Sequence, residues 1–174
     1  MSFEIRPAVP SDASAACAVL RRSIAECCVL DHRNDADILD AWLGNKTPAM
    51  VQSWFESPTN HSLVAVQDGI VVGVSLLTGA GKLALCYLLP EAQRRGAGSA
   101  LLARIEEQAA ALGMQKLHLH STATAEPFFA AQGYRSDGNV RSPYGVETVL
   151  FWKPLIAGAD CDPQRKRFCN CNSA

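Results

Sequence analysis

The residues with the clearest capacity for chemistry form one short turn: Gln93, Arg94, Arg95, Gly96, Ala97 and Gly98. An apolar run over 83–89 precedes this turn and a run of helical character over 99–112 follows it, which predicts a strand, a glycine-rich turn and a helix. Two glycines let the turn adopt positive φ and let a ligand approach the bare backbone. The first N–H groups of the helix lack intrahelical partners and lie at the positive end of its dipole, an arrangement suited to phosphates.

This turn has more than one interpretation. A pyrophosphate would accept hydrogen bonds from the backbone N–H groups of Arg94 through Ser99, and the side chains of Arg94 and Arg95 would add charge-assisted bonds. The alternative is an ordinary strand-to-helix turn with a solvated arginine pair. A P-loop is excluded because Gly-Lys-Ser/Thr is absent, but a nucleotide-binding protein that uses the same turn stays open.

Periodicity and turn residues predict the elements that must position this turn. Expected helices cover 13–28, 36–43, 48–55 and 125–132, and 29–35 is expected to be a polar connection. Expected strands cover 3–7, 61–67, 70–77, 83–89, 116–120 and 148–152, with room for one more at the end of the order. Asp68-Gly69 is a strong hairpin signal, so the three strands before the turn form an antiparallel meander. That meander argues against a Rossmann fold, which needs repeated β-α-β units.

Composition limits the function classes. The chain has 174 residues, is 48% hydrophobic and 19% charged, and carries a formal net charge of −1, so a strongly basic nucleic-acid surface is not indicated. No apolar stretch approaches the roughly 20 residues that span a bilayer, and no signal-peptide pattern opens the chain. We expect a cytoplasmic protein with no nucleic-acid or membrane partner, whose seven cysteines are mostly reduced.

The strand followed by Gln93-x-x-Gly96-x-Gly98 and a helix resembles the acetyl-CoA motif of the GNAT superfamily of N-acetyltransferases. The resemblance covers 1–155 and leaves 156–174 as a C-terminal tail. It implies an α/β fold with a mixed, mostly antiparallel central sheet flanked by helices. It also implies an acyltransferase that uses acetyl-CoA as cosubstrate and acetylates an amine of a small molecule or peptide directly. The alternative is an acyl-CoA-binding or sensing module with little turnover. Similar proteins often pair, so a homodimer is also implied.

The resemblance assigns further cofactor contacts. The backbone of Tyr87, Leu88 and Leu89 would pair with the pantetheine arm, and the Leu88 N–H would stabilise the oxyanion. A second family motif matches the segment 125–134, which with the strand before it adds the contacts Ser121, Thr122, Phe128 and Phe129. Two positions depart from the family pattern. Phe129 replaces a tyrosine that often protonates the departing thiolate, and Thr122 replaces a frequent asparagine.

The groups that would move protons are less well defined. Ser121 or Tyr144 could replace the missing acid. A CoA thiol has a pKa of about 8.5, so its thiolate is a tolerable leaving group even without an acid. His120 is one candidate base, because the pKa of imidazole suits the task. Glu26, Asp31 and His32 are others, in the segment that walls the acceptor site in similar proteins. A base acting through water is a further alternative.

A few residues outside these motifs also bear on function. His118 and His120 share one face of their predicted strand, but no third ligand is evident, so no metal is expected. The tail cysteines could bind a metal or form a bridge: Cys161, Cys169 and Cys171. Cys86 could in principle carry an acyl group, but a cysteine buried in mid-strand is a poor nucleophile. Trp42 and Trp54 either pack in the core or line the acceptor pocket.

Overall fold

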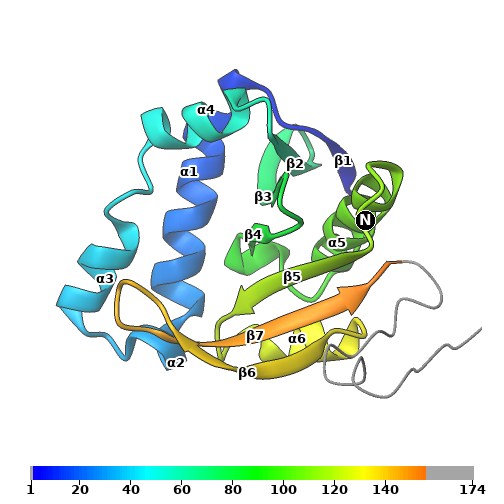
Figure 1. The fold of residues 1–174 in the computed structure, drawn as a ribbon. Helices are drawn as coiled ribbons and strands as arrows, with labels where there is room; N and C mark the ends of the chain where they lie inside the picture. Colours follow the sequence, from blue (N-terminus) through cyan, green and yellow to red (C-terminus); the bar gives the residue numbers. More distant parts are fainter. Residues whose placement is uncertain (1, 156–174) are drawn as a thin grey trace, which may run out of the picture.

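Two antiparallel sheets lie at the centre of the computed structural model, which describes residues 2–155 (Figure 1). The first has the order β1-β2-β3-β4 and the second the order β5-β7-β6. The strands of the first sheet are β1 (Glu4–Pro7), β2 (Asn60–Gln67), β3 (Ile70–Thr78) and β4 (Leu83–Leu88). Those of the second are β5 (Lys116–Ser121), β6 (Arg135–Arg141) and β7 (Glu147–Pro154). The predicted meander, with its hairpin at Asp68-Gly69, is confirmed as β2-β3-β4.

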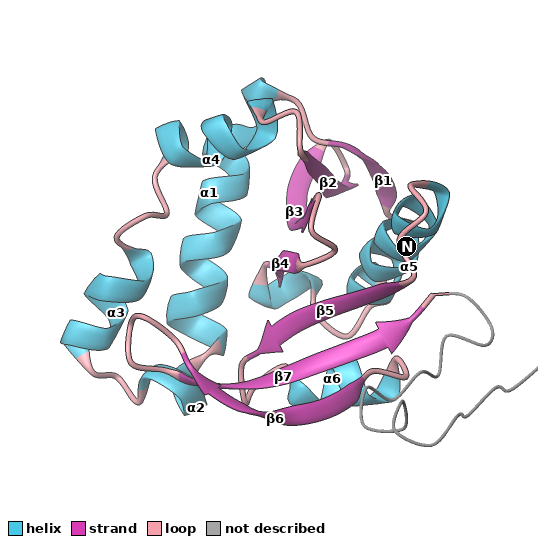
Figure 2. Cartoon of the chain, in the orientation of Figure 1, coloured by secondary structure: helices cyan, strands magenta, loops and turns pink. Residues whose placement is uncertain are grey.

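Helices pack on both sides of the first sheet (Figure 2). The helices are α1 (Ala13–Arg22), α2 (Val29–His32), α3 (Ala36–Leu43), α4 (Pro48–Glu56), α5 (Ala97–Ala111) and α6 (Glu126–Ala131). Short 3-10 turns cover Pro10–Asp12 and Pro90–Ala92, and a π-helical turn, η2, covers Ser23–Cys27. Asp35 caps α3 by accepting from Asp37 N at 2.9 Å, and Thr47 caps α4 by accepting from Met50 N at 3.2 Å. None of the helices among residues 2–155 is long and apolar enough to cross a membrane.

The core lies between the first sheet and the helices on its two faces. Side chains that are fully buried come from α1, from β2 and β3, and from α5: Leu20, Val64, Val74, Leu101 and Ile105. Both α1 and α5 contact β3, which therefore has both faces covered and reads as a continuous apolar run rather than an alternating one. The mixed α/β architecture expected from the sequence is confirmed.

The two sheets separate after a single point of contact. Among residues 2–155, pairing between them is confined to a parallel bridge between Lys82 and His118, where the His118 N–H donates to the Gly81 carbonyl at 3.1 Å. Beyond this bridge β4 and β5 diverge. The β3–β4 register also shifts, because Leu76 faces Leu85 while Leu77 faces Leu83, so Ala84 is an extra residue in β4. The edges of β4 and β5 are left open to each other and can line a cavity.

Three segments differ from the expectations. Residues 29–35 include the short helix α2, which ends where Arg33 (φ 52°) and Asn34 (φ 57°) adopt left-handed backbone. The helix expected over 13–28 changes to the π-helical turn at Ser23. The strand β6 has no hydrophobic alternation, because all of its residues are exposed and hydrogen bonding to β7 alone defines it. The tail 156–174, with Cys161, Cys169 and Cys171, lies outside the described residues.

Candidate active site

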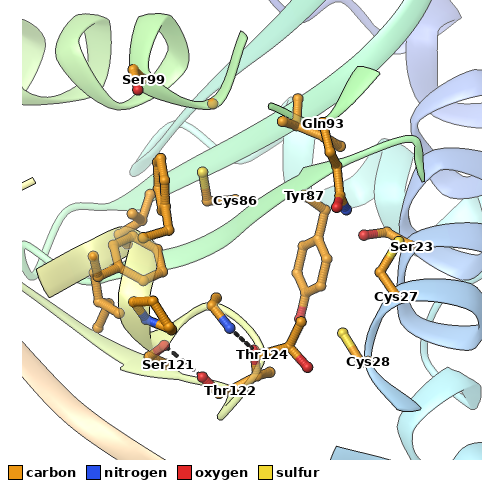
Figure 3. Close-up of a pocket in the computed structure, with 18 of the residues that line it drawn as sticks. Ser23, Cys27, Cys28, Cys86, Tyr87, Gln93, Ser99, Ser121, Thr122 and Thr124 are labelled. Carbon is orange, nitrogen blue, oxygen red and sulfur yellow. Dashed lines mark hydrogen bonds between the residues drawn. The ribbon is translucent and has the colours of Figure 1, made fainter. Parts of the chain in front are cut away.

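A cavity of about 420 Å³ opens where β4 and β5 separate (Figure 3). One end reaches the glycine-rich turn, through Arg94, Gly96, Gly98 and Ser99, while the Gln93 side chain lies beside Ser23 and Cys27. Its middle is walled by β4, β5 and α6, through Cys86, Tyr87, Leu88, Leu119, His120, Ser121, Phe128 and Phe129. The opposite end reaches η2 and the loop after β5, through Ser23, Cys27, Cys28 and Thr124; we call this the acceptor end. The topology thus brings most of the predicted site residues to one cavity.

The register of β4 determines which of its backbone groups face the cavity. The Leu89 N–H donates to the Val72 carbonyl at 2.8 Å, and Leu88 lies opposite Gly73. Because successive residues of an antiparallel strand direct their N–H and C=O groups to alternate sides, those of Leu88 point away from β3, toward the gap beside β5. The Leu88 N–H is therefore directed into that gap, whereas the backbone groups of Tyr87 and Leu89, also predicted as contacts, face β3, where the Leu89 N–H is already bonded.

Two glycines set the position of the Leu88 side chain. A Cβ on Gly73 would lie 2.5 Å from Leu88 Cδ2 and 3.2 Å from the Cβ of Ala65. A Cβ on Gly98 would lie 3.3 Å from Leu88 Cδ1 and 3.4 Å from Phe128 Cζ. The Leu88 side chain thus packs closely against the backbone of two glycines, Gly73 and Gly98. Sequence reasoning missed Gly73, although a glycine inside an apolar strand signals a close approach of this kind.

The glycine-rich turn presents free backbone donors at the start of α5. Arg94 (φ 58°) and Gly96 (φ 90°) adopt left-handed backbone, and the first intrahelical bond runs from Ala100 N to the Gly96 carbonyl at 3.0 Å. The N–H groups of Ala97, Gly98 and Ser99 therefore have no intrahelical acceptor. The helix begins at Ala97, so the predicted glycine-rich turn forms its first turn as well as its approach.

The α6 wall of the cavity is aromatic and carries no acid at the expected place. Phe129 is buried, with its ring centre 5.1 Å from that of Phe128, 5.6 Å from that of Tyr134 and 6.4 Å from that of Phe151. Ser121 is also buried and its hydroxyl donates to the Thr122 carbonyl at 2.8 Å. Thr122 Oγ1 accepts from Ala125 N at 3.1 Å, so it caps the turn into α6. These side chains shape the wall rather than offering a proton.

The family follows from a comparison with known domains. A family model described as an acetyltransferase (GNAT) domain matches residues 30–152. The chain belongs to the GNAT family. The resemblance seen in the turn and the assignment to an acyltransferase family are thereby confirmed, and the match runs along the chain from α2 to β7.

Curated relatives of this GNAT chain are acetyltransferases. An amino-acid acetyltransferase of Azotobacter vinelandii is 33% identical over 85 residues, which is 46% of this chain and 19% of that protein. The chain thus spans about a fifth of that relative's length. An IAA acetyltransferase of Azospirillum brasilense is 30% identical over 132 residues, covering 67% of this chain and 86% of that protein.

Solved structures share the fold. An N-acetyltransferase from Rhodopseudomonas palustris has a TM-score of 0.79 at 23% identity, over 88% of this chain and 96% of that one. The PaiA N-acetyltransferase from Thermoplasma acidophilum, in complex with coenzyme A, has a TM-score of 0.73 at 18% identity, over 88% and 99%. At these identities the likeness shows the shared fold alone.

Of the four candidate bases in this GNAT chain, only His120 belongs to the cavity lining, at an exposed position near the end of β5. Partial burial and the positive charges of Lys82 and His118 hold the pKa of His120 below its usual value, which favours the neutral imidazole that a base requires. The neighbouring His118 has its pKa lowered in the same way. Residues 2–155 contain no cluster of three or more possible metal ligands.

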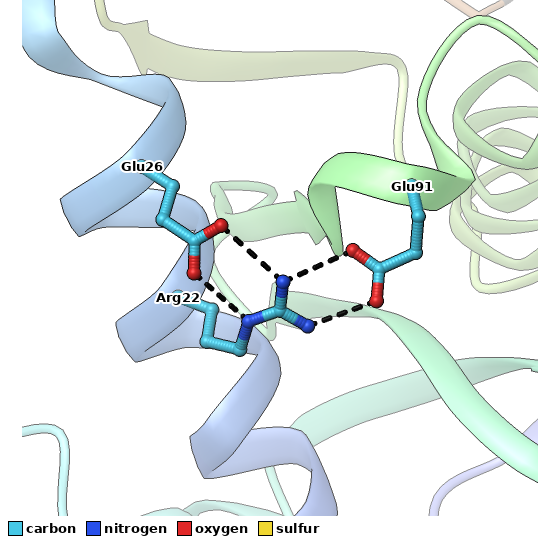
Figure 4. A network of polar contacts seen from close by, with 3 residues as sticks. All are labelled: Arg22, Glu26 and Glu91. Atoms are coloured by element: carbon cyan, nitrogen blue, oxygen red, sulfur yellow. Dashed lines mark hydrogen bonds and ion pairs between the residues drawn. The ribbon is translucent and has the colours of Figure 1, made fainter.

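The other three candidates make structural contacts. Glu26 lies outside the cavity lining and pairs with Arg22 at 2.9 Å, and the same guanidinium pairs with Glu91 at 2.9 Å (Figure 4). Asp31 accepts from Ala123 N and from the Thr124 hydroxyl, each at 2.6 Å. His32 is fully buried; its Nδ1 accepts from Asn34 N at 3.0 Å and its Nε2 lies 3.3 Å from the Ala25 carbonyl.

The acceptor end contains thiols, hydroxyls and one phenol. Figure 3 shows the Tyr87 side chain extending from β4 toward Cys28 and Thr124. Burial raises the pKa of Tyr87 well above its usual value and raises that of Cys28 to about 12, so both are neutral at physiological pH. Burial also raises the pKa of Cys86 to about 12, which makes it a poor nucleophile. The π-helical turn that aims Ser23 and Cys27 here is a feature that sequence periodicity did not predict.

An aromatic stack closes the region behind the acceptor end. Trp42 on α3 stacks on Tyr144 from the β6–β7 loop, with ring centres 5.7 Å apart and planes within 6°. Neither ring lines the cavity, so Tyr144 is not placed to act as the missing acid. Trp54 packs on the main core. Trp42 joins the second, smaller apolar cluster with Ile24 and Cys28, which supports the acceptor end from outside.

Proposed function

We propose that this GNAT chain is an acetyl-CoA-dependent N-acetyltransferase that moves the acetyl group directly to an amine of a small molecule or peptide. The observation that carries the proposal is the shared cavity: the Leu88 N–H and the free donors of α5 open onto the same space. The names of the two relatives support it. So do the bound coenzyme A of the Thermoplasma structure and the acetyl-CoA of a Salmonella typhimurium acetyltransferase structure with a TM-score of 0.68.

The residues present fit acetyl-CoA. The Gly96 Cα faces open space, with nothing within 4 Å of where a Cβ would lie, so a phosphate can approach this backbone. The N–H groups of Ala97, Gly98 and Ser99 and the guanidinium of Arg94 would hold the pyrophosphate. The open edge of β4 at Cys86 and Leu88 would pair with the pantetheine arm, as an added strand does.

The chain's own groups then supply positioning, charge stabilisation and proton transfer. Bound acetyl-CoA supplies an activated acetyl thioester. The Leu88 N–H donates to the carbonyl oxygen, on which negative charge grows as the amine attacks. His120 accepts the proton that the nitrogen loses. Phe129 cannot donate a proton to the departing sulfur, so coenzyme A leaves as its thiolate, with a pKa of about 8.5.

One observation favours a second candidate, an acyl-CoA-binding module with little turnover. The family's acid position is filled by Phe129, which is packed among other aromatic rings. Binding needs only the turn and the β4 edge, whereas transfer needs the leaving group to depart without an acid. The two candidates therefore differ in turnover and not in affinity.

A transfer assay separates these candidates. The purified chain is incubated with isotopically labelled acetyl-CoA and a mixture of primary amines, and acetylated products are identified by mass spectrometry. The proposal requires a labelled amide formed catalytically, with many turnovers per protein molecule. Tight acetyl-CoA binding with no labelled product from any amine would support the binding module instead. A cytoplasmic location and a homodimer stay predictions from the sequence.

A further inference from the structure

The cavity has no acidic wall. Among the described residues that line it, none is Asp or Glu, and its only basic side chains are Arg94 at the turn and His120 on β5. The acceptor end itself offers only neutral groups: the hydroxyls of Ser23 and Thr124 and the thiols of Cys27 and Cys28, beside the Tyr87 phenol. A positively charged substrate would form no direct ion pair with the described lining residues; the nearest negative charge is that of Asp31, which lies behind Thr124 and acts on Cys28 and Tyr87 from there.

The carboxylates nearest in the fold are already engaged. Asp31 on α2 holds the loop after β5 through Ala123 N and Thr124 Oγ1, both at 2.6 Å. Glu26 and Glu91 both pair with the guanidinium of Arg22 on the outer side of η2, as Figure 4 shows. Turning any of these groups toward the cavity would break its existing ion pair or hydrogen bonds.

An alkylammonium ion is poorly matched to such a site. Alkylamines with a pKa of about 10.4 are almost wholly protonated at neutral pH. Entering the cavity, the ammonium would lose hydration without pairing directly with a carboxylate, because Asp31 is already bonded to Ala123 and Thr124, and this is unfavourable in a partly buried site. It would also have to lose a proton before attack, and His120 is the sole candidate base on the cavity wall among residues 2–155.

We propose, on the basis of the function proposed above, that the acceptor is a small, weakly basic aromatic amine that is uncharged at neutral pH. The lone pair of such an amine is delocalised into its ring, so it needs neither a carboxylate to attract it nor a base to deprotonate it first. The phenol ring of Tyr87 and the soft thiols of Cys27 and Cys28 are suitable neighbours for an aromatic ring.

The chemical step balances with the groups present. The amine nitrogen forms a bond to the acetyl carbon, and the carbon–sulfur bond breaks with its electron pair going to the sulfur of coenzyme A. The nitrogen keeps one hydrogen of its NH2 group as the amide N–H. The other passes as a proton to His120 and from there to water or to the thiolate.

A matched pair of amines tests this inference on the wild-type chain. Aniline and cyclohexylamine have rings of the same size but differ in charge at pH 7, and 1,4-diaminobutane carries two positive charges. We expect kcat/KM for aniline, measured from acetylated product by mass spectrometry, to exceed that for each alkylamine at least tenfold. A preference for cyclohexylamine or 1,4-diaminobutane would overturn the inference and leave the acetyltransferase intact. Acetyl-CoA binding with no acetylation of aniline would also overturn it. Failure of acetyl-CoA to bind would instead overturn the proposed function.

A charge introduced at the acceptor end provides the second test. Cys27→Asp puts a carboxylate on the cavity wall, and we expect it to shift the aniline-to-cyclohexylamine ratio of kcat/KM at least tenfold toward cyclohexylamine. Cys27→Ser controls for loss of the thiol. Leu30→Asp adds the same charge on α2 at a side chain that is 72% exposed and outside the cavity lining, and should leave the ratio unchanged. An unchanged ratio in a folded Cys27→Asp protein would contradict the inference. If that variant does not fold, the comparison of amines on the wild-type chain decides.

Discussion

At the scale of single residues, the proposed transfer depends on the direction of one backbone group. Leu88 lies opposite Gly73 in a register that sends its N–H and C=O away from β3. Its side chain packs against Gly73 and Gly98. Side chain and backbone therefore have separate tasks at this position, so they can be changed separately.

Leu88→Pro tests the backbone donor. Proline removes the N–H, and because that group makes no bond to β3 the sheet keeps its ladder. We expect kcat to fall by about 10²- to 10³-fold, the usual cost of losing one oxyanion donor. Leu88→Ala keeps the N–H and removes the side-chain contacts, so it should lose far less. Equal losses in the two variants, measured by steady-state kinetics, would show that the N–H has no special role.

The charge around His120 sets the second prediction at this scale. The base must be neutral, so kcat/KM should rise with pH through the pKa of His120, below about 6.5, and then level off. Lys82→Gln removes a positive charge that lowers this pKa, so the acid limb of the profile should move to higher pH. Lys116→Gln is the matched control, because Lys116 lowers the pKa of His118 instead. Two results would exclude His120 as the base. One is an acid limb that does not move in Lys82→Gln, and the other is an acid limb that persists in both His120→Gln and His120→Ala.

At the scale of elements, α2 and the loop after β5 are tied together across the acceptor end. Asp31, three residues after Cys28, accepts three hydrogen bonds from Ala123 and Thr124. The α1 helix reaches the same place through the π-helical turn, which brings Ser23 and Cys27 to the cavity. Two segments nearly a hundred positions apart in the chain therefore share one wall.

Asp31→Ala should loosen that wall. Leaving the Ala123 and Thr124 donors without an acceptor is expected to lower the free energy of unfolding by about 1–2 kcal/mol and to raise KM for the acceptor more than for acetyl-CoA. Asp31→Asn keeps one acceptor and should recover part of both effects. Urea denaturation and separate KM values for the two substrates measure this. Asp40→Ala, at an exposed carboxylate on α3, serves as the control; if it behaved like Asp31→Ala, the tie would be irrelevant.

The sequence predicted elements where local chemistry is decisive. Apolar runs and Asp68-Gly69 were enough to predict the β2-β3-β4 meander, and Gly96 and Gly98 were enough to predict the turn before α5. It missed β6, because that strand is polar along its whole length and exists only through pairing with β7. The roles of Glu26, Asp31 and His32 could not be read locally, since each depends on a partner's position in the fold. The direction of the Leu88 N–H likewise follows from register and not from composition.

At the scale of the whole molecule, the two sheets and the helices meet around the cavity. Figure 1 shows β5, β6 and β7 diverging from the first sheet, with the β6–β7 loop reaching toward the helices at the other side. There Tyr144 stacks on Trp42, and the ammonium of Lys46 lies 5.6 Å from the Tyr144 ring centre. This contact joins the second sheet to α3 and closes the acceptor side of the fold.

Lys46 should make the fold's stability depend on pH in an unusual direction. It is 4% exposed, its Nζ donates to the Trp42 carbonyl at 3.1 Å, and burial lowers its pKa to about 8. The unfolded chain keeps this proton up to about pH 10.4. Between about pH 8 and that value the unfolded state therefore binds more protons than the folded state, and the free energy of unfolding rises with pH. Below about pH 8 the folded protein must hold a buried charge.

Lys46→Met removes that cost. We expect the variant to be more stable than the wild type at pH 7, by about 1 kcal/mol or more, and the advantage to shrink at pH 9. Urea denaturation at the two pH values measures it. A variant less stable at pH 7, or an advantage that does not change with pH, would mean that the contacts of Lys46 with Trp42 and Tyr144 outweigh its burial.

The most direct test of the central claim is calorimetric titration with acetyl-CoA of four proteins: wild type, Gly96→Asp, Gly96→Asn and Gly113→Asp. Gly96 (φ 90°) and Gly113 (φ 79°) share left-handed backbone and open space for a side chain, so both substitutions carry the same strain, while only Gly96 lines the cavity. Tight wild-type binding that Gly96→Asp weakens at least tenfold, about 1.4 kcal/mol, is the predicted result. Gly96→Asn should lose less, since it adds no charge, and Gly113→Asp should bind as the wild type does. Absence of wild-type binding, or equal losses at the two glycines, would contradict the placement of the cofactor at the start of α5.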